Sequence, residues 1–305
     1  MKADGFGWAL FPAIFLFSAC AERELDFRRE EGQVLVTPDW SGYVCPASAG
    51  YGFYVQDGTG EPAVPVVTAA AAERYSATLP VRDYRMLAFN TDAPGVEYAG
   101  LECLETAEVK LSSTRQPGEV FTWNIDRVEI TREDTVAYAP RPERLVKSVM
   151  LHFQVTGMEA AEVLQGELNG VYPSLSLLRG TPSSASVSAA PMTKTVFSAT
   201  LTRTATRSGD PAYKATAGVR MFGLLCPEDG SAYDCRLHLK VSDTEGDVFQ
   251  TTLDMNGVMT EVIRFHAGEL PADEMVEVEI GIDRVNSTLV AEVKGWTHGS
   301  GSGEV

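Results

Sequence analysis

The chain has 305 residues, of which 42 are acidic and 25 basic, giving a formal net charge of −17. This length suits two domains of ordinary size, each with its own core. The acidic balance argues against nucleic acid as a partner, because phosphate binding needs clusters of lysine and arginine. Four histidines and five cysteines leave little material for a catalytic metal centre. Composition therefore favours a binding or structural protein.

The first twenty residues have the pattern of a secretory signal peptide. Lys2 precedes an apolar run over residues 6–17, and the small residue Ala19 precedes Cys20. A cysteine at this place resembles the lipobox of bacterial lipoproteins, in which the thiol carries a diacylglycerol and the peptide bond before it is cut. We therefore expect residues 1–19 to be removed and Cys20 to be lipidated. The alternative is an ordinary signal peptide cut near Ala19.

Residues 20–26 form an acidic tether. Glu22, Glu24 and Asp26 loosely resemble the export signal of surface lipoproteins in Bacteroides-type bacteria. The expected location is the outer membrane, with the lipid as anchor and the protein exposed at the surface. An ordinary acidic linker is the alternative. No later stretch approaches 18 apolar residues, so the sequence predicts no spanning helix after processing.

The remaining chain is patterned as β-strands. Apolar residues alternate with polar ones over residues 275–283, 236–241 and 149–155, which is the period of a half-buried strand. Such segments recur about every 8–15 residues and are separated by turn signals. This spacing predicts an all-β fold of β-sandwiches. One short helix is expected over residues 68–74, where four alanines follow one another.

Two prolines near residue 140 interrupt the strand pattern and predict a domain boundary. The expected domains are an N-terminal β-sandwich over residues 27–138 and a C-terminal β-sandwich over residues 143–297. Residues 181–206, rich in serine, threonine and alanine, are expected to form a loop or an edge strand. The tail of residues 298–305 is rich in glycine and serine and is expected to be flexible.

The sequence contains no recognisable catalytic, phosphate-binding or zinc-protease motif, so we predict no catalytic site, no metal site, no cofactor and no enzyme activity. Three histidines occupy polar positions of expected strands and the fourth lies in the tail, so solvent-facing side chains are expected for all of them: His152, His238, His266 and His298.

Three acidic residues surround Gly246 at positions 243, 245 and 247. Their order is not that of a calcium-binding EF-hand loop, so a polar hairpin turn is the favoured interpretation.

Four cysteines remain after Cys20, and an oxidising location would permit disulfides. Cys226 and Cys235 flank a turn-forming segment and could join the two ends of a hairpin. Cys45 and Cys103 could pair within the first domain. Zinc is less favoured because paired thiolate ligands usually stand two to four residues apart. Four reduced, partly buried thiols are the alternative.

Several segments together resemble lipoproteins of Bacteroides-type gut bacteria that are similar to the FimB-like anchor proteins of type V fimbriae. The likeness spans nearly the whole chain. It is carried by Cys20 and residues 23–25, 33–40, 84–90, 164–171 and 293–296.

The resemblance implies two tandem transthyretin-like, Greek-key β-sandwich domains on a lipid anchor. In type V fimbriae, stalk pilins lose their first strand to a trypsin-like protease and a strand of another subunit fills the gap, whereas anchor subunits keep their N-terminus. Here Arg28 and Arg29 precede the first strand, so a cut there would release the lipid without opening a groove. This favours an anchor or accessory role, unless the two arginines are ordinary linker charges.

Two functions remain open. The first is a fimbrial anchor or adhesion subunit that accepts a strand from a pilin-like partner by β-augmentation, with the acceptor in the C-terminal domain. The second is a glycan-binding surface lipoprotein of a polysaccharide-uptake system, with an aromatic platform. Unless they belong to the core, the platform residues would be Trp40, Tyr43, Tyr51 and Tyr54.

Overall fold

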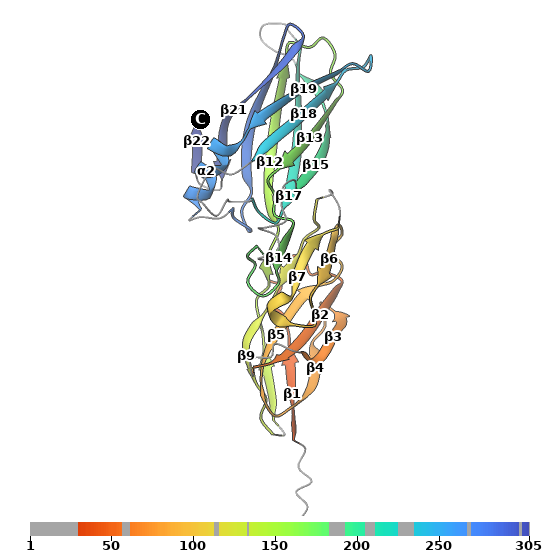
Figure 1. Cartoon of the computed structure of the whole chain (residues 1–305), viewed down its shortest axis with the longest axis vertical. Helices are drawn as coiled ribbons and strands as arrows, with labels where there is room; N and C mark the ends of the chain where they lie inside the picture. The colour runs from red at the N-terminus through yellow and green to blue at the C-terminus, as the bar shows by residue number, and fades with distance from the viewer. Residues whose placement is uncertain are drawn as a thin grey trace, which may run out of the picture.

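The computed structural model is an elongated molecule of two domains stacked end to end (Figure 1). The signal peptide, Cys20, the acidic tether, the Arg28-Arg29 pair and Cys226 lie outside the described residues. Strands dominate both domains, which confirms the predicted all-β fold of two β-sandwiches. The structure describes residues 30–56, 62–112, 116–132, 134–182, 193–204, 211–224, 235–266, 270–298 and 301–304.

A central sheet forms the middle layer of the N-terminal domain. Its strands run in the order β11-β8-β5-β2-β3, and β9 pairs with β5 beside β8. The bounds are β2 (Ser48–Val55), β3 (Pro62–Ala70), β5 (Asp83–Asn90), β8 (Phe121–Thr122), β9 (Ile125–Glu129) and β11 (Glu143–Arg144).

Two three-stranded sheets complete this domain, in the orders β10-β1-β4 and β14-β7-β6. In the first, β1 runs parallel to β10 and antiparallel to β4. The bounds are β1 (Glu31–Val36), β4 (Tyr75–Pro80), β6 (Val96–Ala99), β7 (Glu108–Leu111), β10 (Thr135–Tyr138) and β14 (Ser174–Ser176), with a 3-10 turn η1 (Leu104–Thr106).

The central sheet is buried on both faces. Along β5, Met86 and Ala88 join one apolar cluster with residues of β1 and β4, whereas Leu87 and Phe89 join another with residues of β7 and η1. A strand buried on both sides carries a continuous apolar run instead of an alternation. Residues 84–90, with the sequence YRMLAFN, are such a run.

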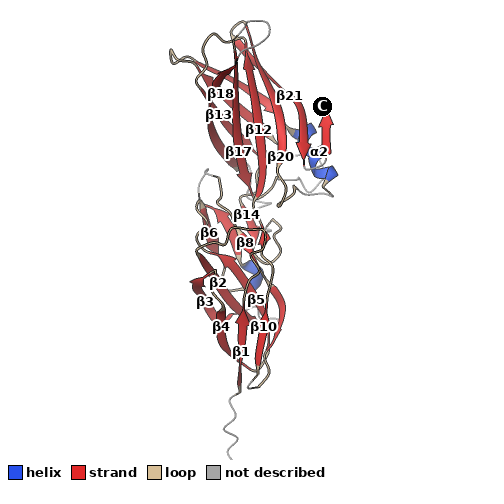
Figure 2. Cartoon of the chain, turned by 180° about the vertical axis from the view of Figure 1, so that it is seen from behind, coloured by secondary structure: helices blue, strands red, loops and turns tan. Residues whose placement is uncertain are grey.

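The C-terminal domain is a two-sheet sandwich (Figure 2). A six-stranded sheet in the order β16-β17-β12-β20-β21-β22 packs on a four-stranded sheet in the order β15-β13-β18-β19. The bounds are β12 (Lys147–Thr156), β13 (Val163–Asn169), β15 (Lys194–Thr200), β16 (Thr202–Thr204), β17 (Ala212–Met221), β18 (Arg236–Ser242), β19 (Val248–Asp254), β20 (Val276–Val285), β21 (Thr288–His298) and β22 (Gly301–Glu304).

The predicted period-two strands of this domain are confirmed. In β20 the alternate residues Val276, Val278, Ile280 and Ile282 are buried. The segments 149–155 and 236–241 lie in β12 and β18, with their apolar residues in the same core cluster. Residues 194–200 and 202–204 form edge strands, one in each sheet, as expected for part of the serine- and threonine-rich segment.

The helix expected over residues 68–74 is wrong, because residues 68–70 belong to β3 and a turn follows. The one α-helix of the described residues is α2 (Asn256–Phe265), which is not among the predicted elements. Its buried residues are spaced i, i+1, i+4 and i+5, a helical pattern that was available in the sequence: Val258, Met259, Val262 and Ile263.

The tail also departs from expectation. His298 is the last residue of β21, and residues 301–304 form β22 against it, although the tail was expected to lack structure. Backbone hydrogen bonding to an existing sheet edge needs no apolar side chain, so a glycine- and serine-rich segment can still pair.

The two domains interleave in sequence near their junction. Strand β11 pairs with β8, and β14 pairs with β7, so both strands extend N-terminal sheets although they follow the prolines near residue 140. Gln116 bridges the domains: its Nε2 donates to the carbonyl oxygens of Val196 and Gly218, and its Oε1 accepts from the amide of Arg220.

Candidate functional site

One edge of the six-stranded sheet is incompletely paired. Strand β21 pairs with β20 along its whole length, but β22 covers only residues 295–298 on the other side. Among the described strands, none pairs with this outer edge over residues 288–294. A row of unpaired backbone donors and acceptors is a template for another strand.

The side chains along this stretch alternate between the core and the outer surface. Leu289 is 3% exposed, and Ala291 and Val293 pack against the core cluster while remaining partly exposed. Val290 is 52% exposed on the opposite face. An added strand could therefore cover apolar side chains that the sandwich leaves partly open.

The edge β3 of the N-terminal central sheet is different. It contains Pro62 and Pro65, and proline cannot donate a backbone hydrogen bond to a neighbouring strand. Proline on an edge strand discourages the addition of further strands. The open edge of β21 contains no proline.

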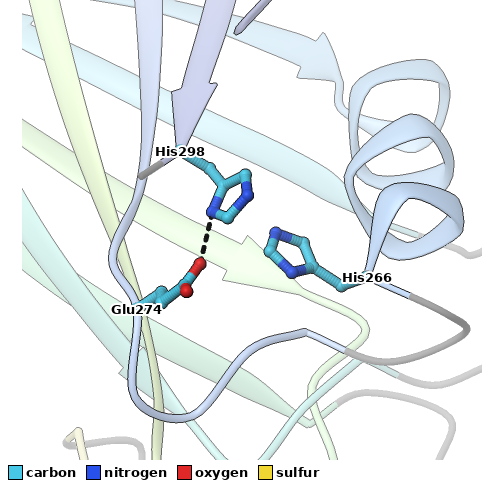
Figure 3. A group of neighbouring side chains, drawn as sticks. All are labelled: His266, Glu274 and His298. Carbon is cyan, nitrogen blue, oxygen red and sulfur yellow. Dashed lines mark ion pairs between the residues drawn. The ribbon is translucent and has the colours of Figure 1, made fainter. Parts of the chain in front are cut away.

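A cluster of two histidines and a carboxylate lies beside the paired end of β21 (Figure 3). His266 follows the end of α2, Glu274 lies shortly before β20, and His298 ends β21. The Nδ1 of His298 is 2.7 Å from Oε2 of Glu274. The centroids of the two imidazole rings are 4.0 Å apart, with the ring planes at 75°. One ligand atom from each residue lies within 4.8 Å of the others.

The surroundings of the cluster favour neutral imidazole at His266. Burial lowers the pKa of His266, and the neighbouring His298 lowers it further, while Glu274 acts in the opposite direction. Its Nε2 is buried and has no hydrogen-bond partner among the described residues. His298 is 7% exposed, and the ring of Phe265 packs edge-on against both histidines.

The segment that carries Glu274 also contacts the N-terminal domain. The Tyr43 hydroxyl donates to Asp273 Oδ1 at 2.6 Å, and Arg144 Nη1 donates to the carbonyl oxygen of Ala272 at 3.2 Å. The hydrogen bond to Asp273, together with burial, raises the pKa of Tyr43. The cluster therefore lies next to the domain junction.

The predicted disulfide between Cys45 and Cys103 is not formed, and both are free thiols. Cys45 packs on the β1 side of the central sheet, whereas Cys103 precedes η1, whose Leu104 belongs to the cluster on the other side. The sheet therefore separates them. Cys235 is fully buried immediately before β18, and its pairing with Cys226 remains a prediction.

The four aromatic residues considered for glycan stacking do not form an open platform. Tyr51 and Tyr54 are 1% and 0% exposed and point into different core clusters. Trp40 packs edge-on against Phe121 and Trp123. Tyr43 is half-buried at the domain junction, with the guanidinium of Arg144 5.4 Å from its ring centroid.

The histidine predictions are partly wrong. His152 and His238 are half-exposed on strand faces, where His152 lies 3.2 Å from Glu277. His298 is buried, and His266 follows a helix instead of lying in a strand. The cluster could not be predicted from the sequence, because His266 and His298 lie far apart in the chain and no short-range pattern relates the end of α2 to the end of β21.

The acidic segment around Gly246 forms the expected hairpin turn between β18 and β19. The amides of Glu245 and Asp247 both donate to Asp243 Oδ1, and Gly246 adopts a positive φ of 92°.

No protein-family model matches the chain, and no curated protein matches it. Solved structures do share its fold. A candidate adhesin from Bacteroides thetaiotaomicron aligns with a TM-score of 0.57 and 10% identity, over 90% of this chain and 97% of that one. A candidate adhesin from Bacteroides ovatus aligns at 0.55 and 16%, over 83% and 91%. The fimbrial anchor protein Mfa2 from Porphyromonas gingivalis aligns at 0.51 and 11%, over 90% and 99%.

These alignments cover both domains and nearly all of each matched chain, so the similarity is one of the whole two-domain fold. The predicted resemblance to FimB-like fimbrial proteins is confirmed at the level of the fold. Within the described residues, no helix is long and apolar enough to cross a membrane.

Proposed function

We propose that this chain is a non-catalytic lipoprotein of the cell surface that anchors or joins a fimbria. In this proposal the outer edge of β21 accepts a strand from a pilin-like subunit. The observation that carries the proposal is the outer edge of β21 over residues 288–294, with which no strand of the described residues pairs. The shared fold with a fimbrial anchor protein supports it.

The edge offers both affinity and selectivity. Seven residues of extended strand span about 23 Å, enough for a short donor strand to form a ladder of backbone hydrogen bonds. Alternate side chains of the donor would pack beside Leu289, Ala291 and Val293, which already face the core. The remaining donor side chains would face solvent beside Val290.

The arrangement of the domains suits a tether at the N-terminus. Strand β1, where the described chain begins, lies in the domain opposite to the one that contains β21 (Figure 1). A lipid on Cys20 would hold the N-terminal domain near the membrane, leaving the edge of β21 available to an incoming subunit on the outward side.

A photo-cross-linking amino acid at position 290 tests the acceptor edge. We expect it to capture a pilin-like subunit on intact cells, and deletion of the gene to shed that subunit into the medium. Two exposed valines on other edge strands are matched controls: Val67 on β3 and Val248 on β19. Capture from position 248 or 67 but not 290 would contradict the assignment to β21. Binding of glycans alone, with fimbriae unchanged by the deletion, would reject the fimbrial role.

The lipid anchor is tested separately with Cys20→Ser. The variant should move from the detergent phase to the aqueous phase on phase partitioning, because two or more acyl chains are what hold such a protein on a bilayer. Ala19→Gly is a control that keeps the thiol. A Cys20→Ser protein that remained in the detergent phase would exclude this cysteine as the attachment site.

A further inference from the structure

We propose that His266, Glu274 and His298 form a binding site for one divalent transition-metal ion, with Zn²⁺ the best match. The site is independent of the proposed strand acceptor. Two imidazoles and one carboxylate are a common zinc ligand set, and a water molecule completes the tetrahedron in open sites of this kind. Imidazole ligands select against Mg²⁺ and Ca²⁺, which prefer oxygen.

The spacing of the three residues suits a tetrahedral ion. With metal–ligand bonds of about 2.0–2.1 Å, neighbouring ligand atoms of a tetrahedral site stand roughly 3.3 Å apart. The contact between His298 Nδ1 and Glu274 Oε2, at 2.7 Å, is slightly shorter, and no pair of ligand atoms exceeds 4.8 Å. Small side-chain rotations would therefore equalise the three distances.

The side chains are already directed toward a common point. In Figure 3 the ring of His266 points from the end of α2 toward His298 and Glu274, which come from two other segments. The buried Nε2 of His266 has no hydrogen-bond partner among the described residues. A buried polar nitrogen without a partner is unfavourable, and a bound metal would satisfy it.

One side of the cluster is open to solvent and the other is buried. Glu274 is 54% exposed in its side chain, which gives an ion a route from solvent, while His298 is 7% exposed. The ring of Phe265 lies against both imidazoles and limits their rotation. This contact with the Phe265 ring helps to keep the two histidine side chains in one conformation when no ion is bound.

The ion would join three segments that the fold brings together. His266 fixes the end of α2, and His298 fixes the end of β21 next to β22. Glu274 fixes the segment whose neighbours, Ala272 and Asp273, contact the N-terminal domain. Metal binding would therefore stabilise both the β21–β22 hairpin and the domain junction.

The alternative to a metal site is a simple ion pair between Glu274 and His298. Another His–Glu pair in the chain allows the two interpretations to be compared. His152 and Glu277 form a similar pair at 3.2 Å on the outer face of the same sheet. The described residues place no second histidine beside that pair within reach of a shared ion. Metal affinity should therefore depend on the cluster and not on the isolated pair.

The test uses the full processed chain, freed of metal with a chelator and titrated with ZnCl₂ by isothermal calorimetry. We expect one equivalent to bind with a micromolar or lower Kd and to raise the thermal unfolding midpoint. His266→Gln and Glu274→Gln should each weaken binding at least about tenfold, whereas His152→Gln should leave it unchanged. CoCl₂ should give the intense visible absorption of a tetrahedral ion in the wild type and lose it in His266→Gln.

The decisive variants are those at His266 and Glu274, because both side chains are more exposed than that of His298. Circular dichroism of the metal-free proteins checks that these variants are folded. Two further variants, His266→Ala and Glu274→Ala, repeat the test if a glutamine variant misfolds. Absence of stoichiometric Zn²⁺ binding by the wild type overturns the proposal. Equal weakening by His152→Gln, or undiminished binding by the cluster variants, also overturns it.

Discussion

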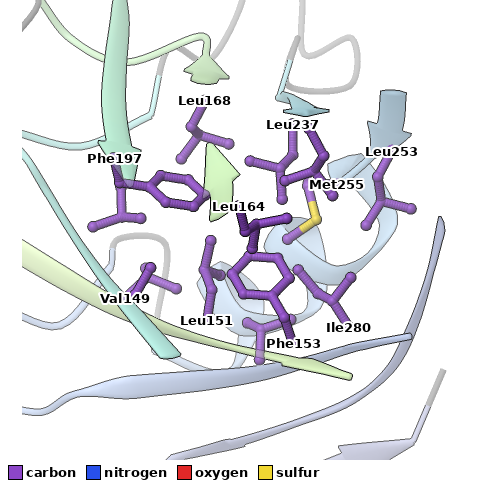
Figure 4. Packing of buried hydrophobic residues seen from close by; sticks show 14 of the residues in the cluster. Val149, Leu151, Phe153, Leu164, Leu168, Phe197, Leu237, Leu253, Met255 and Ile280 are labelled. Atoms are coloured by element: carbon purple, nitrogen blue, oxygen red, sulfur yellow. The ribbon is translucent and has the colours of Figure 1, made fainter. Parts of the chain in front are cut away.

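The two domains use β-strands in different ways. In the N-terminal domain a central sheet lies between two other sheets, so neighbouring residues of β5 are buried on opposite faces. In the C-terminal domain each sheet has one buried face. Figure 4 shows Leu151 and Phe153 of β12 directed into the core with Leu164 of the facing sheet, whereas His152 between them lies on the outer face beside Glu277. Both segments are β-strands, but the number of sheets packed around a strand determines whether its buried residues are consecutive, as in β5, or alternate, as in β12.

The difference extends to the sheet edges. One edge of the central sheet of the N-terminal domain is a strand with two prolines, whereas the long strand β21 of the six-stranded sheet is paired by β22 only over residues 295–298. The two edges, β3 and the outer side of β21, therefore differ in the backbone N–H groups that they present.

The largest expected effect tests burial on both faces of β5. Met86→Ala and Leu87→Ala should each lower the free energy of unfolding of the N-terminal domain by about 2–5 kcal/mol, because both side chains are buried and each leaves a cavity. Denaturant unfolding followed by tryptophan fluorescence measures this. In a protein produced without residues 1–19, which contain Trp8, a Trp296→Phe background leaves Trp40 and Trp123 as the reporters of this domain.

The corresponding pair in β12 is the control. Leu151→Ala should cost about 2–5 kcal/mol, whereas His152→Ala should stay within ~0.5 kcal/mol, since only the first residue is in the core. A cost below ~1 kcal/mol for Leu87→Ala would mean that the third layer contributes little to stability.

Alkaline pH should destabilise the N-terminal domain selectively. Burial raises the pKa of both Tyr51 and Tyr54 to about 12 from the ordinary value of 10. The folded state therefore holds these protons more tightly than the unfolded state. The stability that they contribute is complete below pH 10 and is lost as the pH rises through 12, on the order of 2 kcal/mol for each group.

Unfolding of the two domains at increasing pH, with tyrosinate absorbance recorded in parallel, measures this effect. Tyr54→Phe should flatten part of the pH dependence. Loss of the C-terminal domain before the N-terminal one, or tyrosines that titrate normally while the protein stays folded, would contradict it.

The smallest expected effect concerns the junction between the domains. Gln116→Ala removes the contacts to Val196, Gly218 and Arg220 and should weaken the junction by about 1 kcal/mol, because the site is partly exposed. Amide hydrogen exchange at Arg220 should accelerate. Gln33→Ala, which removes a contact to Ser76 inside the N-terminal domain, is the control. Unchanged exchange at Arg220 would show that Gln116 does not hold the domains together.

The sequence alone determined the all-β class, the strands β12, β18 and β20 of the C-terminal sandwich and the turn around Gly246. These features depend on residues close together in the chain. Polar and apolar residues alternate along β20 because one face of the strand is exposed to solvent, and Asp243 accepts a hydrogen bond from the amide of Glu245. The helical spacing of the buried residues in α2 is local as well, so this helix could also be predicted from the sequence.

Tertiary structure alone decided which distant segments meet. It separated Cys45 from Cys103 across a sheet, paired β14 with β7, and brought His266 to His298 beside Glu274. It also left part of the β21 edge without a described partner. Local patterns report whether a residue faces the core, but strand order and packing between layers depend on contacts between segments far apart in the chain, and periodicity contains no information about those partners.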